Sequence, residues 1–205
     1  MSIHTIICLL LCSVPFAFST RAATLDFEDV GDLEVIGSSR YLSSGAELVG
    51  FQGYLSGVIG GSLNEFDFPP NSGFGVVVNT VDLAEIRFNI PALVVQGFFT
   101  YGGPITLSAY DASNNLLLSI SSAFATNIGT FGDPGSSPNE LLRLETTGAS
   151  RIVIDATNTD FTLDDLTFEP SRPSTVIPEP GFGLAIPAIL GVAWVARRRG
   201  CTLIL

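Results

Sequence analysis

Several residue types that catalytic and metal sites depend on are absent from most of this chain. Its 205 residues include no lysine, and the single histidine is His4. The three cysteines are Cys8, Cys12 and Cys201, so the stretch from 24 to 177 has neither histidine nor cysteine. In that stretch, Ser-His-Asp and Cys-His catalysis, zinc sites built from His and Cys, and disulfide bonds are therefore excluded.

The stretch from 24 to 177 is also strongly acidic. It holds 19 of the 20 Asp and Glu residues but five of the nine arginines, which gives a formal charge of −14. Because such a surface repels nucleic acid, we expect no nucleic-acid partner. This composition is compatible with a glycoside hydrolase that works with two carboxylates, although the spacing of the acids singles out no pair.

The N-terminal end has the features of a signal peptide. Residues 6–18 form an apolar run that small residues follow. We predict a signal peptide over 1–22 with cleavage after Ala22, and cleavage after Ser19 is the alternative. The run is too short for a membrane anchor.

The C-terminal end combines a rigid break, an apolar run and a basic cluster. Pro178, Glu179 and Pro180 cannot continue a regular element, because proline fixes φ and lacks an N–H donor. Residues 181–196 carry no charge and would span roughly 24 Å as a helix, so we predict a transmembrane helix there. The predicted cytoplasmic stop is the cluster of Arg197, Arg198 and Arg199.

In this order, the three parts over 178–199 resemble the PEP-CTERM sorting signal of Gram-negative bacteria. The resemblance implies that an exosortase, a membrane-embedded transpeptidase-like enzyme, reads the signal during export. The implied partners are exosortase, signal peptidase and the membrane. The implied location is an inner-membrane intermediate, and then the cell surface or the extracellular matrix.

The chain between the two ends has an all-β pattern. Short segments rich in β-branched and aromatic residues are separated by clusters of Gly, Asn, Ser, Asp and Pro. We predict a single β-sandwich or jelly roll over 24–168, followed by a Pro/Ser-rich linker over 169–177. The predicted strands are Thr24–Phe27, Leu48–Tyr54, Phe74–Asn79, Ala84–Asn89, Val94–Tyr101, Ile105–Asp111, Leu116–Ser121, Leu141–Glu145, Arg151–Ala156 and Phe161–Phe168.

The segments between these strands lead to two further predictions. Residues 112–115 predict a hairpin turn, because asparagine tolerates a positive φ. Two long segments rich in Gly, Pro, Ser and Asn, 56–73 and 127–139, are either functional rims or mobile decoration.

The last predicted strand breaks strict alternation. Two of its apolar residues share one face, and two share the other. A β-bulge at Asp164-Asp165 would return all four to the core. The four residues are Phe161, Leu163, Leu166 and Phe168.

An opening strand with Asp26-Phe27-Glu28 and a closing strand with Asp164-Asp165-Leu166 resemble carbohydrate-binding-module jelly rolls of the galactose-binding-like type. In those folds the first and last strands lie together, and a structural calcium ion can sit between them. The resemblance implies Glu28, Asp29 and Asp165 as calcium ligands, and Ca²⁺ accepts such oxygen ligands without His or Cys. The alternative is that these acids are solvated turn and edge residues.

A glycan-binding face would need aromatic platforms. The only tryptophan is Trp194 in the apolar run, and most of the 15 phenylalanines are more simply core residues. The remaining aromatic candidates are some of the phenylalanines and the four tyrosines, Tyr41, Tyr54, Tyr101 and Tyr110.

These patterns lead to one reading and two alternatives. We expect an exported, exosortase-sorted protein of the cell surface or extracellular matrix, with a structural or adhesive role and no catalysis of its own. The first alternative is a carbohydrate-binding module for matrix polysaccharide. The second is a glycoside hydrolase with a carboxylate pair.

Overall fold

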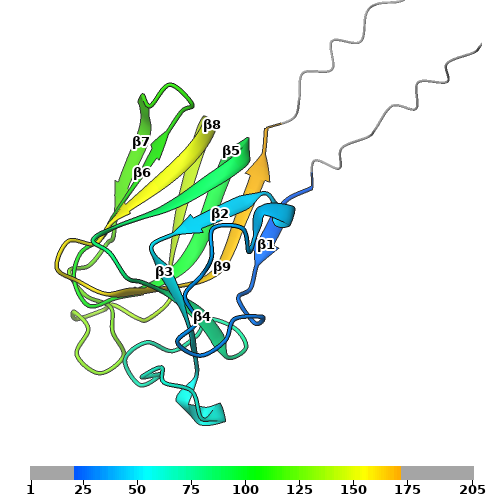
Figure 1. Cartoon of the computed structure of the whole chain (residues 1–205). Helices are drawn as coiled ribbons and strands as arrows, with labels where there is room; N and C mark the ends of the chain where they lie inside the picture. The colour runs from blue at the N-terminus through cyan, green and yellow to red at the C-terminus, as the bar shows by residue number, and fades with distance from the viewer. Residues whose placement is uncertain (1–20, 172–205) are drawn as a thin grey trace, which may run out of the picture. The chain divides into compact units, whose positions relative to one another are not determined.

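The computed structural model describes residues 21–171, and its regular structure is almost entirely β-strand (Figure 1). Two short 3₁₀ helices interrupt the strands, η1 (Leu42–Ser44) and η2 (Gly57–Ile59). No helix among these residues is long and apolar enough to cross a membrane. The strands are β1 (Ala23–Leu25), β2 (Ala46–Val49), β3 (Phe51–Leu55), β4 (Gly75–Asn79), β5 (Leu83–Tyr101), β6 (Thr106–Tyr110), β7 (Leu116–Ser121), β8 (Glu140–Asp155) and β9 (Phe161–Pro170).

All strand pairs are antiparallel and belong to one sheet, which confirms the all-β prediction. The strand order is β3-β4-β9-β5-β8-β6-β7, with β1 added on β9 and β2 added on β5. Strand β5 pairs with β2 through 85–88 and with β9 through 92–101, and register shifts between Arg87 and Val94 mark the change of partner. The expected sandwich is therefore one continuous sheet, because one part of β5 pairs with β2 and the other part pairs with β9.

Two predicted breaks between strands are wrong for the same reason. The segments predicted as Ala84–Asn89 and Val94–Tyr101 form the single strand β5, and those predicted as Leu141–Glu145 and Arg151–Ala156 form most of the single strand β8. In the middle of both strands, Ala92 pairs with Ala149, so the ladder continues where the local sequence predicted a break.

The predicted strand Leu48–Tyr54 is instead divided at Gly50. This glycine has a φ of +82°, a conformation that L side chains rarely adopt, and an added Cβ would lie 2.4 Å from Cγ2 of Val81. The corner ends β2, which pairs with β5, and starts β3, which pairs with β4.

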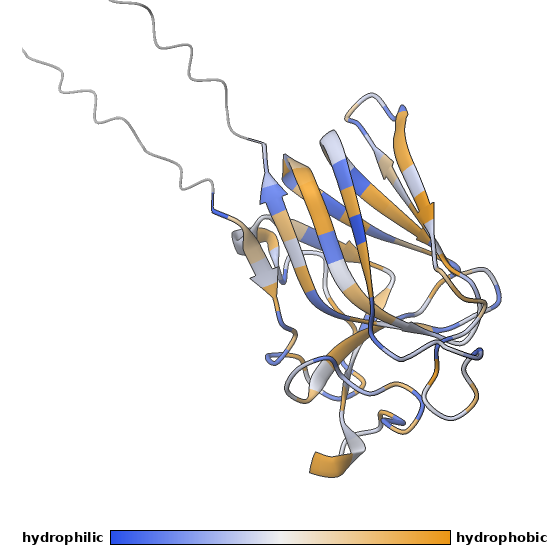
Figure 2. Cartoon of the chain, turned by 180° about the vertical axis from the view of Figure 1, so that it is seen from behind, coloured by the Kyte–Doolittle hydropathy of each residue, from blue (hydrophilic) through white to orange (hydrophobic). Residues whose placement is uncertain are grey.

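A single cluster of buried side chains fills the inside of the sheet. Hydrophobic and hydrophilic residues alternate along the strands (Figure 2), as they must where one face of a strand is buried. Aromatic pairs join strands within this cluster. The Phe88 and Phe168 rings lie 5.1 Å apart, and those of Phe51 and Phe161 lie 6.1 Å apart.

The predicted bulge in β9 is confirmed. Gln96 pairs with Thr167 and Phe98 with Asp164, so β9 has one extra residue here, and Asp165 has a φ of +48°. The bulge returns to the core the four apolar residues that alternation alone would have divided between two faces. All four are buried: Phe161, Leu163, Leu166 and Phe168.

The predicted turn and both long loops lie between the expected strands. Asn114 has a φ of +66° in the hairpin between β6 and β7. The first long loop connects β3 to β4, and the second connects β7 to β8. The linker predicted over 169–177 begins two residues too early, because β9 ends at Pro170. Most of the predicted signal peptide, the rest of the linker and the sorting signal lie outside the described residues.

The two ends of the described chain lie together, at the far end of β9 from the long loops (Figure 1). Ala23 pairs with Phe168, and the Ser171 N–H donates to the Pro91 carbonyl. At about 3.3 Å per residue, the ten residues of β9 separate this end from the loops by roughly 30 Å.

Candidate functional site

The two long loops contact each other at the end of the domain where β9 begins. The Asp67 carbonyl accepts a hydrogen bond from Gly129 N at 2.9 Å, and its carboxylate accepts one from Thr130 N at 3.2 Å. The Asn139 side chain, in the second loop, donates to the Pro69 carbonyl of the first loop at 3.1 Å. The loops therefore form one connected surface.

Throughout the domain, side-chain carboxylates hold loops and turns by accepting hydrogen bonds from backbone N–H groups. Asp32, for example, accepts from Leu55 N and Ser62 N, both at 3.0 Å, and these bonds lower its pKa. Eleven acidic residues act in this way within residues 21–171. They are Asp26, Glu28, Asp32, Glu34, Glu65, Asp67, Asp111, Asp133, Glu140, Asp155 and Asp164.

Asp164 is the most buried carboxylate of this set, with 1% of its surface exposed. Its Oδ2 accepts from Asn71 N at 2.8 Å and from Ser72 N at 2.9 Å, and its Oδ1 accepts from Asp165 N at 2.7 Å. Burial raises the pKa of Asp164 to about 6 against the opposing effect of the hydrogen bond from Ser72 N, and the charge of Asp165 raises it further. The bulge thus aims a carboxylate at the first long loop.

Two of the three predicted calcium ligands bind this same loop. Glu28 accepts from Phe74 N at 2.9 Å and from Gly75 N at 3.0 Å. Asp165 accepts from the Asn71 side chain at 2.8 Å and from the Ser72 hydroxyl at 3.1 Å. The segment that follows β1 and the bulge in β9 therefore both hold residues 71–75, through hydrogen bonds to protein groups.

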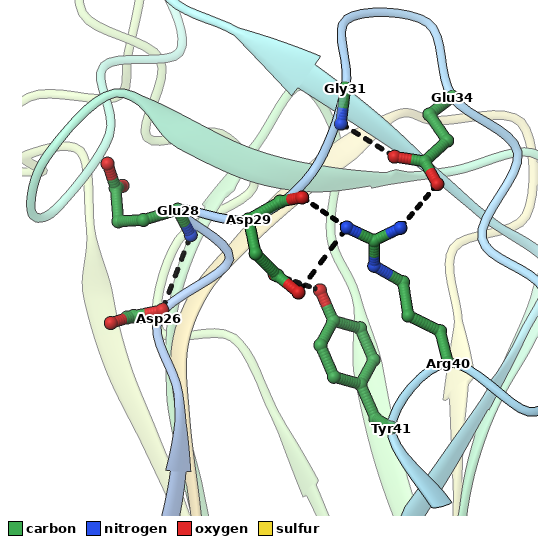
Figure 3. A network of polar contacts seen from close by, with 7 residues as sticks. All are labelled: Asp26, Glu28, Asp29, Gly31, Glu34, Arg40 and Tyr41. Atoms are coloured by element: carbon green, nitrogen blue, oxygen red, sulfur yellow. Dashed lines mark hydrogen bonds and ion pairs between the residues drawn. The ribbon is translucent and has the colours of Figure 1, made fainter.

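The third predicted ligand, Asp29, belongs to a separate network (Figure 3). Its carboxylate accepts from the Tyr41 hydroxyl at 2.8 Å and lies 3.3 Å from the Arg40 guanidinium, which also donates to Glu34. Burial raises the pKa of Tyr41. Within residues 21–171, no group of three or more His, Cys, Asp or Glu side chains is arranged to hold a metal ion.

A groove lies beside the first long loop, and sequence reasoning did not find it. It consists of two adjoining hollows that share Phe68 and Asp160, with volumes of about 170 Å³ and about 500 Å³. Tyr54 and Asn64 line the first hollow, and the second is lined by Asp82, Asn79 and Thr159 among others. We call these two hollows the groove.

Asn79 fixes the wall of the groove. Its Oδ1 accepts from Phe161 N at 2.8 Å, and its Nδ2 donates to the carbonyls of Thr159 at 3.1 Å and Val81 at 3.3 Å. One buried amide thereby joins the end of β4 to the start of β9 and to the turn before β5.

The two acids in the groove differ from the others in the domain. The backbone carbonyls of Asp82 and Asp160 accept hydrogen bonds from Ala156 N and Gly102 N. Their carboxylates, however, have no hydrogen-bond or ion-pair partner within residues 21–171. Among the 19 acids of the domain, Glu169 alone shares this property. Two residues of the groove lining therefore carry carboxylates that no protein group within residues 21–171 occupies.

Of the four tyrosines proposed as glycan platforms, only Tyr54 lines the groove. Tyr41 and Tyr101 are buried, so they cannot be platforms. Tyr110 lies under the Arg151 guanidinium, 4.6 Å from its ring centre. The second aromatic of the groove is Phe68, which composition alone could not separate from the core phenylalanines.

Apolar side chains are also exposed on the loops near the groove. Phe66 in the first loop is 82% exposed, and Phe131 in the second loop is 79% exposed. Their loops are joined by the hydrogen bonds of Asp67 described above. The loop end thus carries aromatic surface outside the groove as well.

The calcium ion stays a prediction, and thermal melting of the protein with and without a chelator tests it. If calcium bridges the first and last strands, excess chelator should lower the melting temperature and added Ca²⁺ should restore it. An unchanged melt in excess chelator would show that the hydrogen bonds to residues 71–75 suffice.

The raised pKa of Asp164 predicts a specific pH dependence. Between the unfolded pKa of 3.8 and about 6, the folded protein binds more protons than the unfolded one, so this residue's contribution to stability falls as pH rises. Relative to Asp164→Asn, the wild type should lose about 2 kcal/mol of unfolding free energy between pH 4 and pH 7. Urea unfolding of both proteins across this range measures the difference, and a constant difference would contradict the prediction.

Comparison with known proteins adds little to this description. No family model and no curated protein matches the chain. The Agl-KA catalytic domain matches at 9% identity with a TM-score of 0.38, over 71% of this chain but only 30% of that one. TmCBM61, solved in complex with beta-1,4-galactotriose, matches at 13% identity with a TM-score of 0.30, over 66% of this chain and 87% of that one. Likenesses this weak establish no function.

Proposed function

We propose that this chain is an exported, exosortase-sorted protein of the cell surface or extracellular matrix with an adhesive role and no catalysis of its own. In this proposal, the groove binds matrix carbohydrate. The resemblance of residues 178–199 to a PEP-CTERM sorting signal supports the export route, and the chemistry of the groove supports the ligand.

The observation that carries the proposal is the position of the groove. It lies at the start of β9, whereas the chain enters and leaves the described domain at the far end of that strand. An anchor that follows residue 171 would therefore attach to the end of the domain farthest from the groove. That attachment point would leave the groove unobstructed, as an adhesive site requires.

The lining of the groove suits a sugar. Aromatic side chains such as Tyr54 and Phe68 pack against the apolar faces of sugar rings. Carboxylates and amides nearby can accept and donate hydrogen bonds to hydroxyl groups, and they set the orientation of the ring. The groove combines the two kinds of group in one place.

A hydrolase with a carboxylate pair remains the alternative, because Asp82 and Asp160 line the same groove. Release of reducing sugar from the host's matrix polysaccharide, abolished by Asp160→Asn, would favour it. Binding without turnover would favour the adhesive role.

Removing the aromatic side chain that lines both hollows of the groove should weaken binding. We expect Phe68→Ala to reduce the affinity for the native host's matrix polysaccharide about tenfold, because it removes one stacking surface. The matched control is Leu116→Ala, an exposed residue on β7 that does not line the groove. Retention on immobilised polysaccharide and the melting temperature are measured together. Equal retention of both folded variants would contradict the proposal.

The export route predicts the mass of the mature protein. The protein isolated from the host's cell-surface fraction should have lost residues up to Ala22 and should end close to Pro178–Pro180. Intact-mass spectrometry measures both ends. A product that still carries residues 181–205 would point to a simple membrane anchor instead of exosortase processing.

A further inference from the structure

We propose that the groove binds glycan segments that lack acid groups and discriminates against acidic polysaccharides. This inference rests on the proposed carbohydrate-binding function and names the class of glycan. Its basis is the unequal use of the 19 acids in the domain.

Almost all of these acids have protein partners. Sixteen have a carboxylate that accepts a hydrogen bond or pairs with an arginine within residues 21–171, and three do not. Two of the three, Asp82 and Asp160, line the groove, and the third, Glu169, lies near the far end of β9. The unpaired carboxylates therefore concentrate where a ligand would bind.

No positive charge compensates these two carboxylates. None of the arginines within residues 21–171 lines the groove. Four of them are paired with acids elsewhere: Arg40, Arg87, Arg143 and Arg151. A uronate or a sulfated sugar in the groove would thus place its charge beside two like charges. At physiological ionic strength, repulsion is screened only beyond about 8 Å, which exceeds contact distance.

The same two carboxylates favour hydroxyl and amino groups. Hydrogen bonds from Ala156 N and Gly102 N to their carbonyls fix the backbone of both residues in the lining of the groove. A sugar hydroxyl that donates to an ionised carboxylate makes a charge-assisted hydrogen bond, which is stronger than a neutral one. With Tyr54 and Phe68 in the same groove, an uncharged sugar can stack and donate at the same time.

The experiment uses the protein purified from the host's surface fraction and the host's own matrix polysaccharide. Anion exchange separates the polysaccharide into an uncharged fraction and an acidic fraction, and part of the acidic fraction is reduced at its carboxyl groups. Binding of the wild type to the three samples is compared at low and high salt. We expect the uncharged and reduced samples to bind at least fivefold more tightly than the acidic sample, with a smaller ratio at high salt.

The double variant Asp82→Asn, Asp160→Asn should lower the ratio of affinities for the uncharged and acidic samples about fivefold or more. It removes both charges and keeps an acceptor oxygen at each position. Glu169→Gln is the matched control. It removes the third unpaired carboxylate outside the groove, and it should leave the ratio unchanged. If all three proteins give the same ratio, or if the wild type prefers the acidic sample, the inference is wrong.

Failure of the inference can be told apart from failure of the proposed function. Binding of every sample with no effect of charge would overturn the selectivity and keep the carbohydrate-binding role. Absence of binding to all three samples by the folded wild type would overturn both.

Discussion

The loops of this domain depend on carboxylates that accept hydrogen bonds from backbone N–H groups. The domain has no cysteine for disulfide bonds, no lysine and few arginines, so these common ways of holding loops are scarce or absent. Acceptor groups, in contrast, are abundant, and eleven acidic side chains bind loop amides. The acidity of the sequence is therefore an architectural property as well as a property of the surface.

The bulge in β9 connects this interaction to the groove. It keeps the apolar residues on both sides of it in the core, and it turns Asp164 toward Asn71 N and Ser72 N. Phe68 lies three residues before Asn71 in the same loop and lines both hollows of the groove. A local irregularity in the last strand thus fixes the loop segment that follows this aromatic residue.

The sequence predicts the parts of this structure that depend on local patterns. Alternation and turn residues are enough for the all-β class, for the hairpin at 112–115 and for the bulge at Asp164-Asp165. The division at Gly50 depends on the close approach of Val81, and the continuity of β5 depends on its partner β8; neither is visible locally. The groove was missed because Tyr54, Phe68, Asp82 and Asp160 come from separate segments that only the fold brings together.

The carboxylates also divide by the direction in which pH affects them. Hydrogen bonds lower the pKa of Asp32, Glu65, Asp67 and Asp111, so the stability that these residues contribute is present above the unfolded pKa and is lost as pH falls through the folded one. Burial gives Asp164 the opposite pH dependence, because its folded environment favours the protonated carboxyl group. Near neutral pH the carboxylates that hold the loops are therefore ionised, and the charge on buried Asp164 lowers the stability of the fold. The same carboxylate holds Asn71 and Ser72 in the loop beside the groove.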